Sequence, residues 1–150
     1  MKKLGLVGGM GPESTIPYYH DIVYSVQKKL GKSQFPEISI ESVDLFKVTG
    51  YCASKEYDKL VDYLFKAIDN LTKSGCDFAA LSANTPHIVF DELKKKSKIP
   101  LISIIEATAD EAQKKSMKKI GLLGTVFTME GDFFKKPFID KNIDFYTEKW

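Results

Sequence analysis

The feature that most constrains the fold of this chain is a regular alternation of short apolar runs with longer amphipathic stretches. Apolar runs that suit buried strands lie at residues 3–8, 36–44, 76–81 and 100–104. Stretches with helical periodicity follow them at residues 12–31, 54–74, 86–97 and 106–115. Four strand–helix units in succession predict a doubly wound α/β fold, with helices on both faces of a parallel sheet and strand order 2-1-3-4.

The stretch at residues 54–74 shows the helical pattern most clearly. Its apolar side chains recur with a period near 3.6 residues, at Tyr57, Leu60, Val61, Leu64, Ile68 and Leu71. Gly75 follows it, in the usual place for a helix C-terminus. The segment before this helix contains Thr49 and Gly50 and is expected to be a loop.

A second feature is an internal repeat. Residues 118–125 repeat residues 2–9, with glycine matching glycine and aliphatic matching aliphatic at the strand positions. Convergence on a generic buried strand is one explanation, and duplication of a whole unit is the better one. We therefore expect a first α/β domain at residues 1–116 and the beginning of a similar domain at 117–150. Its sheet would be incomplete, so the chain is expected to be a fragment of a longer protein.

Composition excludes several functional classes. The chain has 43% hydrophobic residues and a net charge of +2, with acidic residues and lysines mixed along it. This argues against a disordered chain and against a nucleic-acid or membrane surface. The two cysteines have no metal-ligand spacing, so no metal is expected and a reduced cytoplasmic setting fits. All 22 basic residues are lysines, so no guanidinium is available to bind an anion.

Polar residues gather where the predicted strands end. The glycine-containing turn at residues 8–15 follows the first strand, and Ser82, Asn84 and Thr85 follow the third. Ligands of open α/β sheets bind at the carboxyl ends of the strands. The glycine turn matches neither the dinucleotide fingerprint nor a Walker pattern, so it is either a small-carboxylate site at a helix N-terminus or a purely structural turn.

Several other residues have two possible roles. Thr125 and Thr128 occupy the turn of the second repeat, where Thr128 is expected to be a helix N-cap; they either face the same cleft as Thr85 or cap the helix only. His87 could be a general base, although a histidine in the first turn of a helix more often forms a local hydrogen bond. Glu13 is expected to serve the helix dipole.

Together these segments resemble the aspartate/glutamate racemase family, in the right order and over essentially the whole chain. The resemblance is carried by Gly8–Thr15, Ala83–His87 and Gly124–Glu130. It implies two similar α/β domains with the active site between them. It also implies racemisation without a pyridoxal cofactor, in which one cysteine from each domain exchanges the α-proton on opposite faces of the substrate.

The resemblance implies that Asn84 and Thr85, which match positions of the family's motif, bind the α-carboxylate of the substrate. Gly9, Met10, Ser82, Thr125 and Thr128 would line the cleft, with His87 in a supporting role. The first catalytic cysteine of the family's Cys-Asn-Thr-x-His motif falls on position 83, which is alanine here. Either this loss is engineered, or it is natural in a divergent or inactive member, or the register is off by one and Ser82 is the working residue.

The second cysteine would fall beyond Trp150, so the 150-residue chain is expected not to racemise anything. The implied ligand is an amino acid or dicarboxylate and the implied assembly a homodimer, with no cofactor. Lys47 is a weak candidate for a second carboxylate, so a neutral or broadly chosen amino acid is equally compatible. Two alternatives remain: a non-catalytic amino-acid-binding homologue, and a one-thiol isomerase or decarboxylase of the same superfamily.

Overall fold

The computed structural model describes residues 1–31 and 33–147 of the 150-residue chain. Its elements, in chain order, are β1 (Leu4–Gly8), α1 (Pro12–Leu30), β2 (Ile38–Ser42), α2 (Leu45–Ala53), α3 (Tyr57–Lys73), β3 (Phe78–Leu81), η1 (Thr85–Val89, a 3₁₀ helix), α4 (Phe90–Lys96), β4 (Leu101–Ile102), α5 (Ile104–Lys114), β5 (Lys119–Gly121), α6 (Val126–Glu130), α7 (Asp132–Ile139) and β6 (Asp144–Tyr146). None of the described helices is long and apolar enough to cross a membrane.

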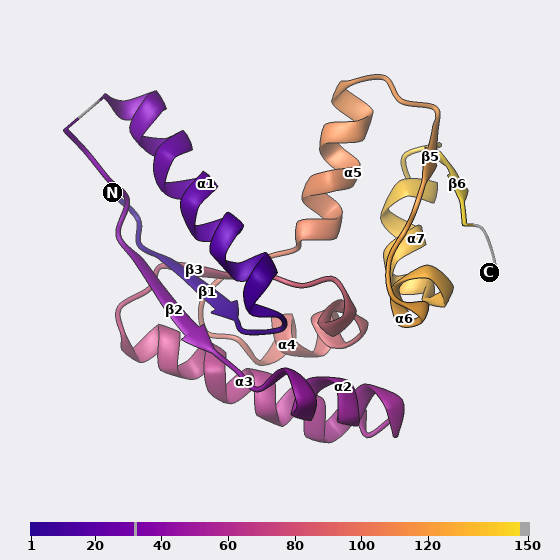
Figure 1. Ribbon diagram of the computed structural model, residues 1–150, viewed down its shortest axis with the longest axis horizontal. Coiled ribbons are helices and arrows are strands. Elements are labelled where there is room, and N and C mark those ends of the chain that lie inside the picture. Colours follow the sequence, from indigo (N-terminus) through magenta and orange to yellow (C-terminus); the bar gives the residue numbers. More distant parts are fainter. Residues whose placement is uncertain (32, 148–150) are drawn as a thin grey trace.

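The predicted sheet is confirmed. Strands β2, β1, β3 and β4 are parallel and lie in that order, and Leu4 of β1 pairs with Ile38 of β2 and Phe78 of β3. Every residue of β1 is buried, as its unbroken apolar run predicts for a central strand. The carboxyl ends of β1 and β3 therefore lie side by side at one edge of the sheet (Figure 1).

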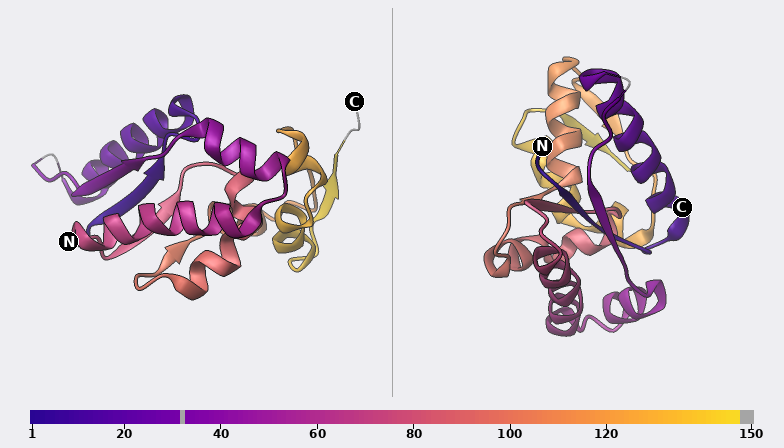
Figure 2. Two further views of the ribbon diagram at one scale, coloured as in Figure 1. Left: turned by 90° about the horizontal axis from the view of Figure 1, so that it is seen from below. Right: turned by 90° about the vertical axis from the view of Figure 1, so that its left-hand side faces the viewer.

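Helices cover the two faces of this sheet unequally. Helix α3 packs against β1 and β2 and buries the predicted apolar face, including Leu60, Leu64 and Ile68. Helix α1 lies on the opposite face (Figures 1 and 2). Its apolar side chains Ile16 and Tyr19 are exposed, at 68% and 48%, so its helical pattern is correct but its apolar face is not fully covered in the described structure.

Two local expectations are wrong. The expected loop around Thr49 and Gly50 is helix α2. Asp44 caps this helix by accepting a 2.8 Å hydrogen bond from the Phe46 N–H, and Val48 and Cys52 anchor it in the core. Burial of these side chains outweighs the low helix propensity of threonine and glycine.

The second error concerns the turn after β5. The N-cap of α6 is Thr125 rather than Thr128, because the Thr125 hydroxyl accepts the hydrogen bond from the Thr128 N–H, at 3.3 Å. The helix thus begins three residues earlier than expected. It is also short, since Gly131 separates α6 from α7.

The C-terminal part forms its own small sheet and core. Strands β5 and β6 pair in parallel, and a hydrophobic cluster joins α5 to α7 through Ile105, Ala109, Phe134 and Phe138. Helix α5 stands away from the first sheet and beside this C-terminal part (Figure 1). The division of the chain at residues 116 and 117 stays a prediction.

Candidate functional site

The turn after β1 is built around Gly9. This residue has φ +85°, and a Cβ there would lie 2.4 Å from the Val43 carbonyl oxygen, so only glycine fits. Its N–H donates a 2.9 Å hydrogen bond to Oγ1 of Thr15, in the first turn of α1. The turn is therefore held against both the chain that follows β2 and the start of α1.

The turn after β3 is tied to the turn after β1 by Ser82. Ser82 is 1% exposed, and its hydroxyl donates a 3.2 Å hydrogen bond to the Val7 carbonyl and lies 3.1 Å from Oγ1 of Thr15. The Ser14 hydroxyl donates to the Ser82 carbonyl at 3.0 Å. A hydroxyl engaged in this way holds two turns together, which argues against Ser82 as the reacting group.

The next residues present their side chains at the strand end. Ala83 offers a methyl group only, and Asn84 is exposed. Thr85 begins η1, and its Oγ1 lies 3.2 Å from Oγ1 of Thr125 and 3.5 Å from that of Thr128. The hydroxyls of Thr125 and Thr128, which follow β5, lie 3.1 Å apart. Three threonine hydroxyls, one from the chain after β3 and two from the chain after β5, thus converge at one point.

These residues line a pocket of about 400 Å³. The turn after β1 and the start of α1 form one wall, the turn after β3 and Ile104 another, and the turn after β5 a third. The lining is mostly small and polar: Met10, Gly11, Glu13, Ser14, Tyr18, Ser82, Ala83, Asn84, Thr85, Ile104, Gly124, Thr125 and Thr128.

Most of the residues named from the sequence therefore come together. Gly9 and His87 are not among the pocket-lining residues. Gly9 contributes only by allowing the tight conformation of the turn after β1. The binding roles of the others stay predictions, because position in a pocket does not by itself establish contact with a ligand.

His87 lies behind the polar turn, with 4% of its surface exposed. Its Nδ1–H donates a 2.9 Å hydrogen bond to the Ala83 carbonyl, and its ring stacks on Phe90 at 4.9 Å. Within the described residues Nε2 has no hydrogen-bond partner. Burial lowers the pKa of His87 to about 4, against the smaller raising effect of its backbone hydrogen bonds. The imidazole is neutral near pH 7 and supports the turn.

Sequence reasoning overlooked Tyr18 and Ile104 and gave Glu13 only a dipole role. Tyr18 lies four residues after Ser14 on α1, and this i, i+4 spacing could have placed it on the pocket side. Burial raises the pKa of the Tyr18 phenol, which keeps it protonated. Ile104 carries no such signal, since only the course of the chain after β4 brings it to the pocket.

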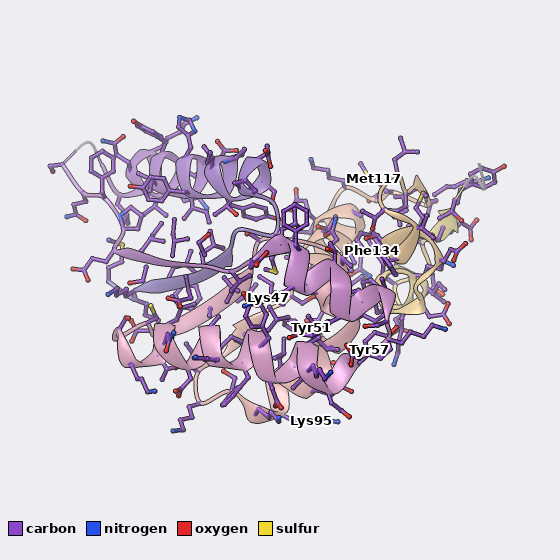
Figure 3. The ribbon with its side chains drawn as sticks, turned by 60° about the horizontal axis from the view of Figure 1, so that its bottom comes forward. Lys47, Tyr51, Tyr57, Lys95, Met117 and Phe134 are labelled. Atoms are coloured by element: carbon purple, nitrogen blue, oxygen red, sulfur yellow. The ribbon has the colours of Figure 1, made fainter. Side chains whose placement is uncertain are left out.

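Neither a thiol nor a metal cluster belongs to this pocket. Cys52 and Cys76 are buried in the core beneath the sheet, and burial raises the pKa of Cys52. No group of His, Cys, Asp and Glu within the described ranges could hold a metal ion. Lys47 lies on α2 beside Tyr51, where its ammonium sits 5.6 Å from the centre of the Tyr63 ring (Figure 3). It is not a pocket residue.

The arrangement suits recognition of a small anion such as a carboxylate. An amide and several hydroxyls can donate hydrogen bonds, and the walls exclude part of the solvent. Position 83, by contrast, has no group that could take up or release a proton.

Comparison with known proteins assigns a family to this architecture. The profile of the Asp/Glu/hydantoin racemase family matches residues 7–146. The broad specificity amino-acid racemase RacX of Bacillus subtilis is 29% identical over 138 residues, which are 89% of this chain and 59% of RacX.

Two crystal structures are similar over 99% of this chain and 65% of their own. One is a Yersinia pestis protein provisionally assigned as an Asp/Glu racemase, with 35% identity and a TM-score of 0.90. The other is PH1733 of Pyrococcus horikoshii OT3, an aspartate racemase homologue, with 34% identity and a TM-score of 0.87. The chain thus spans less than two thirds of the length of these relatives.

Proposed function

Since the chain belongs to the Asp/Glu/hydantoin racemase family, we propose that the protein is an amino-acid racemase that inverts the α-carbon by proton transfer without a pyridoxal cofactor. The observation that carries this proposal is the pocket at the carboxyl ends of β1 and β3. It gathers the Asn84 amide with the hydroxyls of Thr85, Thr125 and Thr128.

In this proposal Asn84 and Thr85 bind the α-carboxylate of the substrate. The amide and the hydroxyl donate to its oxygens, and the threonine cluster lets the hydroxyls reorient when the carboxylate arrives. These donors also stabilise the charge that develops when the α-proton is removed. Ser82 and Gly9 hold the turns in place, and Met10 contributes an apolar wall.

The pocket supplies no acid–base group at position 83. Racemisation by two bases needs one group on each face of the α-carbon, with a pKa that permits both uptake and release of a proton. We therefore propose that the chain of 150 residues is inactive by itself. The acid–base chemistry of the whole protein would come from a region corresponding to the further length of the relatives.

We propose two similar α/β domains, with residues 1–116 forming the first and residues 117–150 beginning the second, as a cytoplasmic homodimer. The repeated strand segment and the separate β5–β6 sheet support the two domains. Light scattering on the purified protein would measure the dimer directly.

A second candidate function is a non-catalytic amino-acid-binding protein. Ala83 favours it, because a methyl group leaves the carboxylate-binding groups intact but removes the proton exchange on this face.

The experiment that separates the two functions is α-deuterium incorporation. The protein as its gene encodes it would be incubated in D₂O with L-aspartate, L-glutamate and several neutral and basic amino acids, and exchange followed by NMR. We expect exchange of at least one amino acid. Calorimetric binding of amino acids without exchange of any of them would establish the binder instead.

A further inference from the structure

We propose that Glu13 makes this pocket select amino acids with a cationic side chain over dicarboxylic ones. This inference rests on the proposed function, since it names the substrate class of the same pocket. It arises from the charge of the pocket wall, which differs from what a site for aspartate or glutamate requires.

Glu13 is the single charged residue that lines the pocket within residues 1–31 and 33–147. No lysine belongs to the lining, and the chain contains no arginine. Lys47, the cation suggested by the sequence, is placed over the Tyr63 ring instead. A second carboxylate on the ligand would therefore meet a like charge and no counter-charge from this part of the protein.

The geometry makes the Glu13 carboxylate available to a ligand. Glu13 stands in the first turn of α1, and its Oε2 lies 3.0 Å from where a Cβ of Gly11, another lining residue, would be. The carboxylate thus folds back over the turn after β1. It takes part in none of the ion pairs formed within the described residues.

Two parts of the pocket lining differ in chemistry. Glu13 comes from the first turn of α1, whereas the groups proposed to bind the α-carboxylate, Asn84 and Thr85, come from the chain that follows β3. In this proposal one ligand places its α-carboxylate on the hydroxyls and amide and its terminal ammonium on Glu13. Ion pairs of exposed groups such as Glu13 are worth up to about 1 kcal/mol, which corresponds to roughly fivefold in kcat/KM or affinity.

Two other roles for Glu13 predict different results. If its carboxylate bound the α-ammonium, which all amino acids share, it would not discriminate between side chains. If it served only the dipole of α1, its removal would lower stability and leave the choice of substrate unchanged. Comparison of L-lysine with L-norleucine, which has the same chain without the terminal amine, separates these roles.

The test uses the gene-encoded protein and measures kcat/KM for α-deuterium exchange of L-lysine, L-norleucine and L-glutamate. We expect L-lysine to exceed L-norleucine about fivefold and L-glutamate to fall below both. In Glu13→Gln the ratio of L-lysine to L-norleucine falls to about 1. Asp58→Asn, which removes an exposed acid from the equivalent first turn of α3, is the matched control and keeps the native ratio.

Preference for L-glutamate, or an equal loss for all three amino acids in Glu13→Gln, would overturn the inference and leave the proposed racemase intact. If nothing exchanges, the proposed function fails, and dissociation constants for the same three ligands then decide the inference. Equal affinity for L-lysine and L-norleucine, or no binding of either, would refute it.

Discussion

At position 83 the side chain ends at a methyl group, while its neighbours Asn84 and Thr85 keep the polar atoms that suit a carboxylate. The backbone of this turn is well held, since the Ala83 carbonyl accepts a hydrogen bond from His87 and Ser82 is anchored to β1. A side chain introduced at position 83 would therefore be presented at the pocket without the need to rebuild the turn.

We predict that Ala83→Cys in the gene-encoded protein raises α-deuterium exchange by about 100-fold or more, because a positioned acid–base group contributes on that scale. Ala83→Ser serves as the control of similar size, since a hydroxyl is a far weaker acid than a thiol. Exchange is measured by NMR in D₂O. A folded Ala83→Cys variant with unchanged exchange would show that position 83 is not where the proton is transferred.

The buried imidazole of His87 leads to a prediction about how the free energy of unfolding depends on pH. Its pKa is about 4 in the folded protein against 6.5 for an unperturbed histidine, so the unfolded chain binds the proton more readily. The free energy of unfolding should be unaffected by this group above pH 6.5. As the pH falls from 6.5 to 4 it should decrease, by up to about 3 kcal/mol.

Urea unfolding at several pH values measures this effect. His87→Gln should flatten the pH dependence between pH 6.5 and 4. Equal pH dependence in the native protein and His87→Gln would contradict a neutral, buried imidazole at this position.

At the scale of elements, helix α2 forms because of its N-cap and its buried side chains, although it contains residues of low helix propensity. The segment contains Thr49 and Gly50, both poor helix formers, and so predicts a loop. In the folded protein Asp44 caps the helix, and Val48 and Cys52 enter the core. The burial of those two side chains depends on α3, which lies later in the chain.

We predict that Asp44→Ala lowers the free energy of unfolding by about 1 kcal/mol, the usual cost of losing an N-cap. Its side chain accepts the hydrogen bond from the Phe46 N–H, which has no other helical partner. Chemical denaturation measures the change, with Glu37→Ala as an exposed acidic control before β2. Equal stability of the two variants would mean that α2 does not need its cap.

At the scale of the whole molecule, two hydrophobic clusters lie in different parts of the chain. The larger one surrounds α3 under the first sheet and contains Leu64, and the smaller one joins α5 to α7 and contains Phe138. Both side chains are at most 1% exposed. The threonine cluster of the pocket connects the two parts at their polar edge.

We predict that the two clusters unfold separately. Leu64→Ala should lower the midpoint temperature of one calorimetric transition, and Phe138→Ala that of the other. The free energy of unfolding should fall by about 2–5 and 3–5 kcal/mol, respectively, because each substitution removes a large buried side chain. Ile139→Ala, at an exposed position beside Phe138, is the control for the second variant. A single transition shifted by both substitutions would contradict independent unfolding of the two clusters.

The alternation of apolar runs and amphipathic stretches was enough to determine the parallel sheet and its order 2-1-3-4, because burial of both faces and short right-handed connections leave few other arrangements. The gathering of Ser82, Asn84 and Thr85 near the β1 turn followed from the same rule, since the carboxyl ends of parallel strands meet at one edge.

What only the tertiary structure decided depends on contacts between distant residues. Packing of elements far apart in sequence brings Thr85 to Thr125, buries His87 and adds Ile104 to the pocket. It also places Lys47 over the Tyr63 ring and outside the pocket lining. Periodicity reports which face of an element is apolar. It does not report which neighbour covers that face, and the chemistry of this pocket is set by those neighbours.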